Sequence, residues 1–125
     1  MEHIKCEAAV RHANSSNCIA YEHPMQNSEI NIGVVEIAQR YPDQGYAMNH
    51  KCSEIVYVIK GLGKLFTETS EVILSSGDVA YIPRGERYRW EGNMTMVISS
   101  TPAWYPGQHE SNLNVDAPLF LSDEN

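Results

Sequence analysis

His50 and Glu54 are the side chains of this sequence best suited to chemistry, because an imidazole and a carboxylate are common proton donors and acceptors in enzymes. They directly precede an apolar run, Ile55 to Ile59, that ends shortly before Gly61. If this run is a core strand, the two residues form a polar pair inside an apolar interior. Such a pair either acts on a bound molecule or is a hydrogen-bonded network without chemistry, since buried polar groups need partners. The residues alone leave both interpretations open.

Cys52 adds a third candidate, since positions 48, 50, 52 and 54 share one parity and would point the same way on an unbroken strand. Together with His50 and Glu54, its thiol could hold zinc or iron. The other two cysteines, Cys6 and Cys18, lie far away in the sequence, and no C-x-x-C pair is present. We therefore expect reduced thiols rather than a disulfide framework or a zinc knuckle.

Short β-strands are the elements that must position these side chains. Apolar residues alternate from Ile30 and change parity near Gly33, which predicts a strand with a bulge or bend. We expect further strands at 55–59, 62–67, 72–74, 79–82, 87–90 and 94–99, with turns at Gly61 to Gly63 and at Gly92 and Asn93. Strands that recur about every eight to twelve residues without helical periodicity are typical of an all-β sandwich or barrel.

The length of 125 residues predicts a single domain, 1–125, with a barrel core at about 30–100. Residues 1–29 are polar with short apolar pieces, and fit either edge strands or a loose arm. Residues 101–125 contain too many large apolar side chains for disorder, so we expect this tail to pack on the barrel or on a second subunit. We expect the histidines outside the core, His3, His12, His23 and His109, to be solvated. His109 has one alternative, because the W-Y-P-G segment before it could fold the tail across the barrel mouth.

The charge balance excludes several classes of partner. Sixteen acidic and nine basic residues give a net charge of -7, which repels nucleic-acid phosphates and anionic lipid. No apolar run approaches the length of a membrane helix, and the first residues are polar and charged rather than signal-like. We expect a cytoplasmic protein that binds neither nucleic acid nor membrane.

The spacing of the turn residues resembles the cupin family of small β-barrels, whose motifs read G-x5-H-x-H-x3-4-E-x6-G and G-x5-P-x-G-x2-H-x3-N. Glu54 and Gly61 have the required six residues between them, and His50 stands at the second histidine of the first motif. The second motif is matched in full spacing at Gly77, Pro83 and Gly85. The resemblance covers 42–92 and implies an all-β fold, a double-stranded β-helix or jelly-roll barrel.

The resemblance also implies where a metal would be held, namely at Met48, His50, Glu54 and Tyr88. A thioether is a weak donor and a neutral phenol binds divalent ions poorly, so two of the four usual ligands are replaced. We therefore expect no tightly bound metal. If one is bound, its ligands are His50 and Glu54 with Cys52 or Tyr88 as a third, although cupins usually turn within this stretch, which argues against Cys52.

The expected function is binding of a small molecule in the barrel interior, in a pocket lined by Met48, His50, Glu54, Tyr88 and Trp90. One alternative is a metal-dependent dioxygenase or isomerase with an unusual ligand set. Another is a metal-free epimerase or lyase that uses His50 and Glu54 as acid and base. A third is a regulatory domain whose pocket is vestigial.

The run Ile55 to Ile59 is apolar at every position, which predicts a strand covered on both faces. Cupins often pair through their sheets, so the resemblance implies a homodimer, and the two-sided apolar strand is consistent with it.

Overall fold

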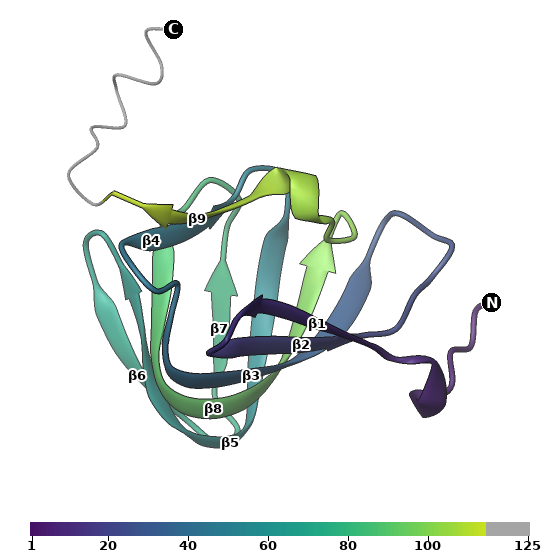
Figure 1. Cartoon of the computed structure of the whole chain (residues 1–125), viewed down its shortest axis with the longest axis horizontal. Coiled ribbons are helices and arrows are strands. Elements are labelled where there is room, and N and C mark those ends of the chain that lie inside the picture. The colour runs from purple at the N-terminus through teal and green to yellow at the C-terminus, as the bar shows by residue number, and fades with distance from the viewer. Residues whose placement is uncertain (115–125) are drawn as a thin grey trace, which may run out of the picture.

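Two long antiparallel strands, β5 (Ser53–Thr67) and β8 (Tyr88–Thr101), form the base of the fold in a computed structural model that describes residues 1–114. They pair along nearly their whole length, from Ser53 opposite Thr101 to Thr67 opposite Tyr88. Figure 1 shows both strands curving through the bottom of a cup-shaped sheet. This curvature encloses the interior in which the candidate site lies.

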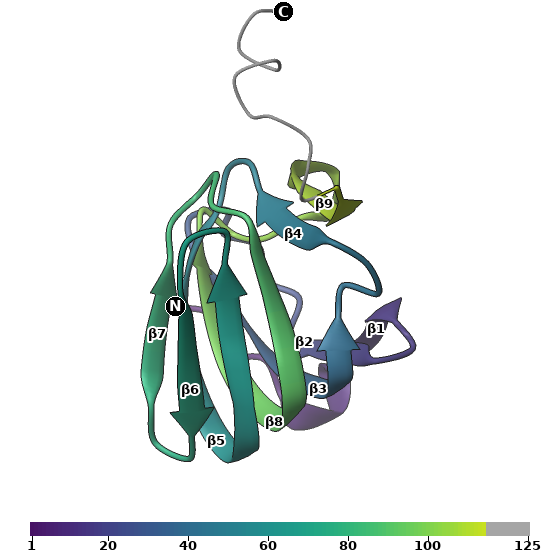
Figure 2. The ribbon, with the colours of Figure 1, turned by 90° about the vertical axis from the view of Figure 1, so that its left-hand side faces the viewer.

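The remaining strands extend the sheet from these two. They are β1 (Val10–Ser15), β2 (Cys18–Glu22), β3 (Asn31–Tyr41), β4 (Tyr46–Asn49), β6 (Glu71–Ser75), β7 (Val79–Ile82) and β9 (His109–Leu113), with short 3-10 helices η1 (Cys6–Ala8) and η2 (Pro106–Gln108). The order of hydrogen-bonded strands in the sheet is β1-β2-β3-β8-β4-β9. Strand β5 pairs with β8 and, in addition, with β6 and β7. Strands β4 and β9 cross the top of the cup in Figure 1, and β5, β6 and β7 lie together on the side shown in Figure 2.

The core follows the period-two alternation of the strands. On β5, Val56 and Val58 are fully buried, whereas Ile55 and Tyr57 between them are 54% and 49% exposed. Met96 on β8 is also fully buried against this inner face. The expectation of a strand covered on both faces is therefore wrong for the single chain, in which only the inner face is covered.

The expected turns at Gly61 to Gly63 and at Gly92 and Asn93 are also wrong, because β5 and β8 continue through them. The glycines permit a close approach of the two strands. A Cβ atom on Gly61, whose φ is +102°, would lie 2.2 Å from the carbonyl oxygen of Asn93, and one on Gly92 would lie 2.5 Å from the Cα atom of Gly63. Glycine marks both turns and close backbone contacts, so the sequence could not separate the two.

The chain ends contribute strands as well. Within 1–29, β1 and β2 form a hairpin that pairs with β3 and lies in front of the cup in Figure 1. In the tail, β9 pairs with β4. The expected packing of the apolar residues Leu119, Phe120 and Leu121 lies outside the described residues. Among residues 1–114, no helix has the length and apolar character needed to span a membrane.

Candidate functional site

The inside of the cup contains a cavity with about 580 Å³ of empty space, including open solvent at its mouth. Its lining residues come from β1, β2, β3, β5, β8, β9 and the segment before η2: Asn14, Cys18, Ala20, Glu22, Asn31, Ile32, Gly33, Val35, Tyr41, Glu54, Tyr88, Trp90, Ile98, Ser100, Trp104 and His109. A second hollow, with about 880 Å³ of empty space that again includes open solvent, shares the lining residues Glu22, Asn31 and Trp104 with it.

Glu54 is the buried acid of the cavity. It is only 6% exposed because the alternation of β5 turns its side chain inward, in line with Val56 and Val58. The hydroxyl of Ser100 donates a hydrogen bond to Glu54 Oε2 at 3.0 Å. Burial raises the pKa of Glu54 to about 6, while the hydrogen bond from Ser100 opposes this shift. The carboxyl group is thus placed to take up or release a proton near neutral pH.

Tyr41, His109 and Asn49 form a hydrogen-bonded chain at the same cavity. The Tyr41 hydroxyl lies 2.7 Å from His109 Nε2, and His109 Nδ1 lies 2.8 Å from Asn49 Oδ1. The indole Nε1 of Trp104, which can only donate, lies 3.1 Å from the same Asn49 atom, so this atom is the amide oxygen. His109 therefore carries its hydrogen on Nδ1, and Nε2 accepts a hydrogen bond from Tyr41.

The ionisation of this chain is set by burial. Burial lowers the pKa of His109 to about 4, so its imidazole is neutral at physiological pH, although Glu110 opposes this shift. Burial likewise raises the pKa of the Tyr41 hydroxyl and the pKa of the Tyr88 hydroxyl above their ordinary value. Both phenols are therefore neutral hydrogen-bonding groups.

Asn49 organises the upper wall of the cavity. Besides Trp104 and His109, its Oδ1 accepts a hydrogen bond from Gln108 Nε2 at 2.9 Å. Its Nδ2 is buried and makes no hydrogen bond of ordinary geometry within residues 1–114, yet it lies close enough to Glu54 and Tyr88 to lower the pKa of each slightly, against the larger effect of burial. The amide nitrogen is thus a donor available beside the acid of the site.

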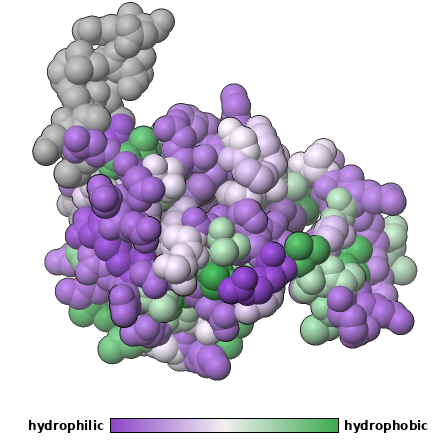
Figure 3. Space-filling model, in the orientation of Figure 1, coloured by the Kyte–Doolittle hydropathy of each residue, from purple (hydrophilic) through white to green (hydrophobic). Residues whose placement is uncertain are grey.

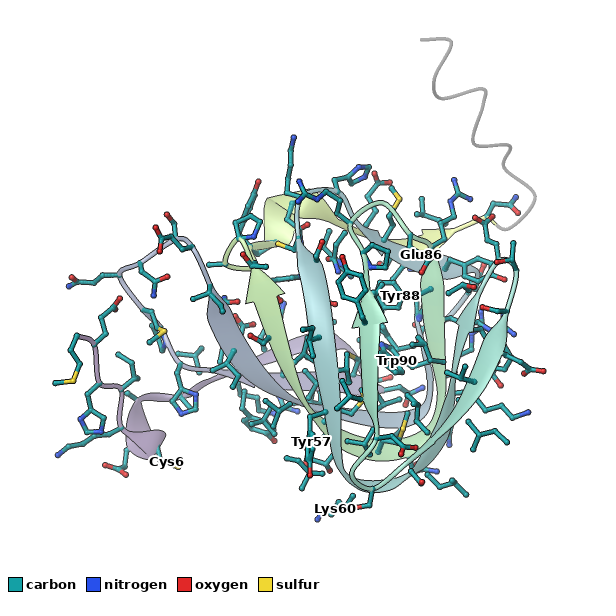
Figure 4. The ribbon with its side chains drawn as sticks, turned by 180° about the vertical axis from the view of Figure 1, so that it is seen from behind. Cys6, Tyr57, Lys60, Glu86, Tyr88 and Trp90 are labelled. Carbon is teal, nitrogen blue, oxygen red and sulfur yellow. The ribbon has the colours of Figure 1, made fainter. Side chains whose placement is uncertain are left out.

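Aromatic rings and carboxylates dominate the remaining lining. Tyr88 and Trp90, two residues apart on β8, pack edge to face with centroids 6.1 Å apart, and both lie inside the barrel (Figure 4). Glu22 and Glu54 are the charged lining residues, and no lysine or arginine belongs to the described lining. The cavity therefore has apolar walls, several neutral hydrogen-bonding groups and a negative rather than positive charge.

Three of the five residues expected in the pocket line this cavity, namely Glu54, Tyr88 and Trp90. Met48 and His50 do not. His50 is exposed on the rim, where its Nε2 contacts Glu110 Oε1. The chain bends at His50 and Lys51 between β4 and β5, so the common parity assumed for positions 48 to 54 is broken. The pocket imidazole comes from His109 instead, so the expectation that this histidine is solvated is wrong, and the alternative in which the tail folds over the barrel mouth describes it better.

The expected ligand sets for a metal are not assembled. His50 is separated from Glu54, and the buried Cys52 thiol donates to the carbonyl oxygen of Pro102 at 3.2 Å rather than lining the cavity. Within residues 1–114, no three histidine, cysteine, aspartate or glutamate side chains are grouped as a metal ion requires. The one imidazole in the cavity, that of His109, already uses both ring nitrogens. These residues therefore do not fit the metal centre that the resemblance implies.

Sequence reasoning missed Tyr41, Asn49, Ser100 and Trp104. Ser100 directly follows the expected apolar strand 94–99, which is a local signal for it. Its position opposite Glu54 comes only from the register of β5 and β8. Tyr41 acquires its role through His109, and Asn49 through His109, Trp104 and Gln108, all of which lie far away in the sequence. Nothing in the local sequence indicates these contacts.

Comparison with known proteins adds three findings. A family profile described as Cupin domain matches residues 34–99. No curated protein matches the sequence.

Solved structures are similar to this chain at low sequence identity. A Streptomyces Pac13 variant with uridine has a TM-score of 0.78 and 18% identity, over 89% of each chain. Pac13 is described as a nucleoside dehydratase. An RmlC-like cupin from Shewanella frigidimarina has TM-score 0.67 and 17% identity over 82% of this chain and 93% of that chain. The polyketide cyclase RemF from Streptomyces resistomycificus has TM-score 0.69 and 10% identity, covering 98% of this chain and 93% of that chain.

Proposed function

Because the chain belongs to the cupin family, whose domain profile matches more than half of it, we propose that its barrel binds an uncharged polar organic molecule and catalyses proton transfer on it without a metal ion. The observation that carries the proposal is Glu54, a buried carboxyl group with a pKa of about 6, in a cavity that also contains the neutral Tyr41 and His109 pair. General acids and bases are most effective when their pKa lies near the working pH.

The charges of the lining support an uncharged ligand. Glu22 and Glu54 would repel a phosphate or carboxylate group, and no cation in the described lining would compensate. The neutral donors and acceptors, Asn14, Asn31 and Ser100, suit hydroxyl or amide groups instead. The aromatic side chains Tyr88 and Trp104 provide walls for a ring.

In this proposal Glu54 is the catalytic residue. Its carboxylate removes a proton from a carbon made acidic by a neighbouring carbonyl, and its protonated form returns a proton to a leaving hydroxyl. The Tyr41 hydroxyl, held by neutral His109, orients a ligand oxygen beside it. Loss of water is the favoured outcome, because Pac13 is described as a nucleoside dehydratase and was determined with uridine in variants of a tyrosine or a histidine. Tyrosine and histidine also line the cavity here.

The proposal includes a cytoplasmic location. Cys6, Cys18 and Cys52 are all free thiols, a state that the reducing cytoplasm maintains.

The experiment that tests the proposal is a screen of neutral sugars and nucleosides that carry a carbonyl group, with mass spectrometry to detect loss of water or uptake of deuterium from solvent. We expect the reaction to fall at least a hundredfold in Glu54→Gln, as is typical when a general acid or base is removed. Binding should persist in that variant because the amide is isosteric. His50→Gln, on the exposed rim, serves as the control and should keep its activity. Equal activity in Glu54→Gln and wild type would refute the proposal.

A further inference from the structure

The second hollow has no part in the proposed reaction, although it shares Glu22, Asn31 and Trp104 with the cavity around Glu54. We call it the outer hollow and the cavity around Glu54 the ligand cavity. The lining of the outer hollow comes from β1, from the end of β2 and the loop after it, from the start of β3 and from the segment that leads into η2: Val10, His12, Glu22, His23, Pro24, Met25, Asn27, Asn31, Ala103, Trp104 and Pro106. Because three residues belong to both linings, the two spaces are neighbours in the fold.

Strand β1 runs from one space into the other. Val10 and His12 line the outer hollow, whereas Asn14, the next residue but one along β1, lines the ligand cavity. The pairing of β1 with β2 places Val10 opposite Glu22 and His12 opposite Ala20, so both strands contribute to this floor. The step of four residues from Val10 to Asn14 spans ~13 Å of extended strand. The floor is therefore long enough for two linked rings.

Trp104 stands at the boundary of the two spaces. Its indole ring lies 5.5 Å from the ring of His109 in the ligand cavity and 6.2 Å from the ring of His12 in the outer hollow, measured between centroids. Its backbone N–H donates to Asn31 Oδ1 at 3.1 Å, and Asn31 Nδ2 donates to its carbonyl oxygen at 3.4 Å. Its Nε1 donates to Asn49 at 3.1 Å. The indole is thus a fixed aromatic surface that a ligand can contact from either space.

The loop between β2 and β3, which forms the far wall of the outer hollow, is tied to the rest of the fold. The carboxylate of Glu2 accepts hydrogen bonds from the backbone N–H groups of Gln26 and Asn27 at 2.6 and 3.0 Å. The backbone N–H of Ala103 donates to the carbonyl oxygen of Ser28 at 3.1 Å. Figure 1 shows this loop to the right of the cup. The hollow therefore has pre-formed walls, as small-molecule sites usually do.

The polar side chains of the outer hollow indicate what it binds. His12, Glu22 and His23 are half-buried, and within residues 1–114 their side chains make no hydrogen bond or ion pair. Imidazole and carboxylate groups can pair with the hydroxyl or amide groups of a ligand. No lysine or arginine belongs to the described lining, so an anionic group would meet the Glu22 carboxylate without a compensating cation of that kind. Figure 3, with β1 and β2 in front, shows this side of the molecule as mostly hydrophilic, which favours a polar small molecule over an apolar protein surface.

We infer that the outer hollow binds the second ring of a neutral two-ring ligand whose first ring lies beside Glu54. The inference rests on the proposed function, because it takes the reacting ring to occupy the ligand cavity. The second ring packs against the indole of Trp104 and the side chain of Met25. Its hydroxyl or amide groups pair with Glu22 and His23. The substrate class is then a neutral glycoside, a nucleoside or a disaccharide, rather than a single sugar.

The test is calorimetric titration with one-ring and two-ring compounds, namely ribose against uridine and glucose against maltose. In wild type we expect at least one two-ring compound to bind about tenfold or more tightly than its one-ring fragment, since the second ring adds contacts in a pre-formed site. A gain for uridine alone identifies a heterocycle as the second ring, and a gain for maltose alone identifies a sugar.

Two variants change the outer hollow in different ways. His12→Ala removes part of its floor, and Met25→Trp fills it from the exposed loop. Both should reduce the gain of the two-ring compound to less than about threefold, while the affinity for the one-ring fragment changes little. Arg11→Ala, at an exposed position next to His12 that does not line the hollow, is the matched control and should keep the full gain.

Circular dichroism establishes that each variant is folded, and Met25→Trp serves alone if His12→Ala does not fold. Equal affinity of wild type for the one-ring and two-ring compounds would overturn the inference and leave the proposed function standing. A gain that survives in the folded outer-hollow variants, or that is lost equally in Arg11→Ala, would place the second ring elsewhere and overturn the inference too. Absence of binding by all four compounds would overturn the inference together with the proposed function.

Discussion

Replacing Glu54 and His109 by glutamine should change the pH dependence of stability in opposite directions, because burial shifts their pKa values oppositely. For Glu54 the pKa rises from 4.5 in the unfolded chain to about 6 in the fold. The folded protein therefore binds the proton more tightly, and the resulting stabilisation is lost as the pH rises from about 4.5 to 6. A shift of about 1.5 units corresponds to ~2 kcal/mol in the free energy of unfolding.

His109 acts in the opposite sense, since its pKa falls from 6.5 to about 4. The unfolded chain binds the proton more readily, so stability is lost as the pH falls from about 6.5 to 4. The shift corresponds to ~3 kcal/mol. In wild type the two effects oppose each other between pH 4.5 and 6, so the total shows only their difference.

The assay is urea denaturation followed by circular dichroism across pH 4 to 7, with each variant compared to wild type. Relative to wild type, Glu54→Gln should become more stable by ~2 kcal/mol as the pH rises through its window. His109→Gln should become less stable relative to wild type by ~3 kcal/mol as the pH rises from about 4 to 6.5. Glu68→Gln, at an exposed carboxylate in the turn after β5, is the control variant. Flat differences for both cavity variants, or differences of the same sign, would refute the burial of these two groups.

Three further changes test the packing and the hydrogen bonds. Tyr41→Phe removes the donor to His109 Nε2 and should cost about 1 kcal/mol in urea denaturation; an unchanged stability would contradict the bond. Gly61→Ala should destabilise by several times the ~1–2 kcal/mol expected for Gly77→Ala, because both have positive φ but only Gly61 faces another strand; equal losses in thermal melts would contradict the close approach. Met96→Ala, at a fully buried position, should lose ~2–5 kcal/mol in the same melts, and a loss below 1 kcal/mol would contradict its core position.

The all-β barrel of the cupin type was predictable from the sequence and is confirmed, because alternation and turn residues are local signals. Glu54, Tyr88 and Trp90 reach the cavity for the same reason, since each lies within a regular strand where parity fixes the side-chain direction. The strand ends were less predictable. The glycines in β5 and β8 suggested turns in the sequence. In the structure they lie within the two strands and allow their backbones to approach closely.

The acid and base partners of the site were predictable only in part. Placing His50 beside Glu54 assumed an unbroken strand, and the bend at His50 removes that assumption. His109 enters the cavity through the pairing of β9 with β4, a contact between segments about sixty residues apart. Such long-range pairing depends on how the whole sheet curves, so a single sequence shows at most the W-Y-P-G segment that precedes His109.

Calorimetric titration of matched neutral and phosphorylated compounds decides whether the cavity around Glu54 and His109 takes an uncharged polar ligand, as we propose. Uridine and uridine 5'-monophosphate form one such pair, and neutral sugars with their phosphates form others. We expect the neutral members to bind more tightly than their phosphates by about tenfold or more, because the carboxylates of the lining repel phosphate. We also expect His109→Gln to weaken this binding and His50→Gln to leave it unchanged. Tighter binding of the phosphates, or neutral binding unaffected by His109→Gln, would contradict the proposal.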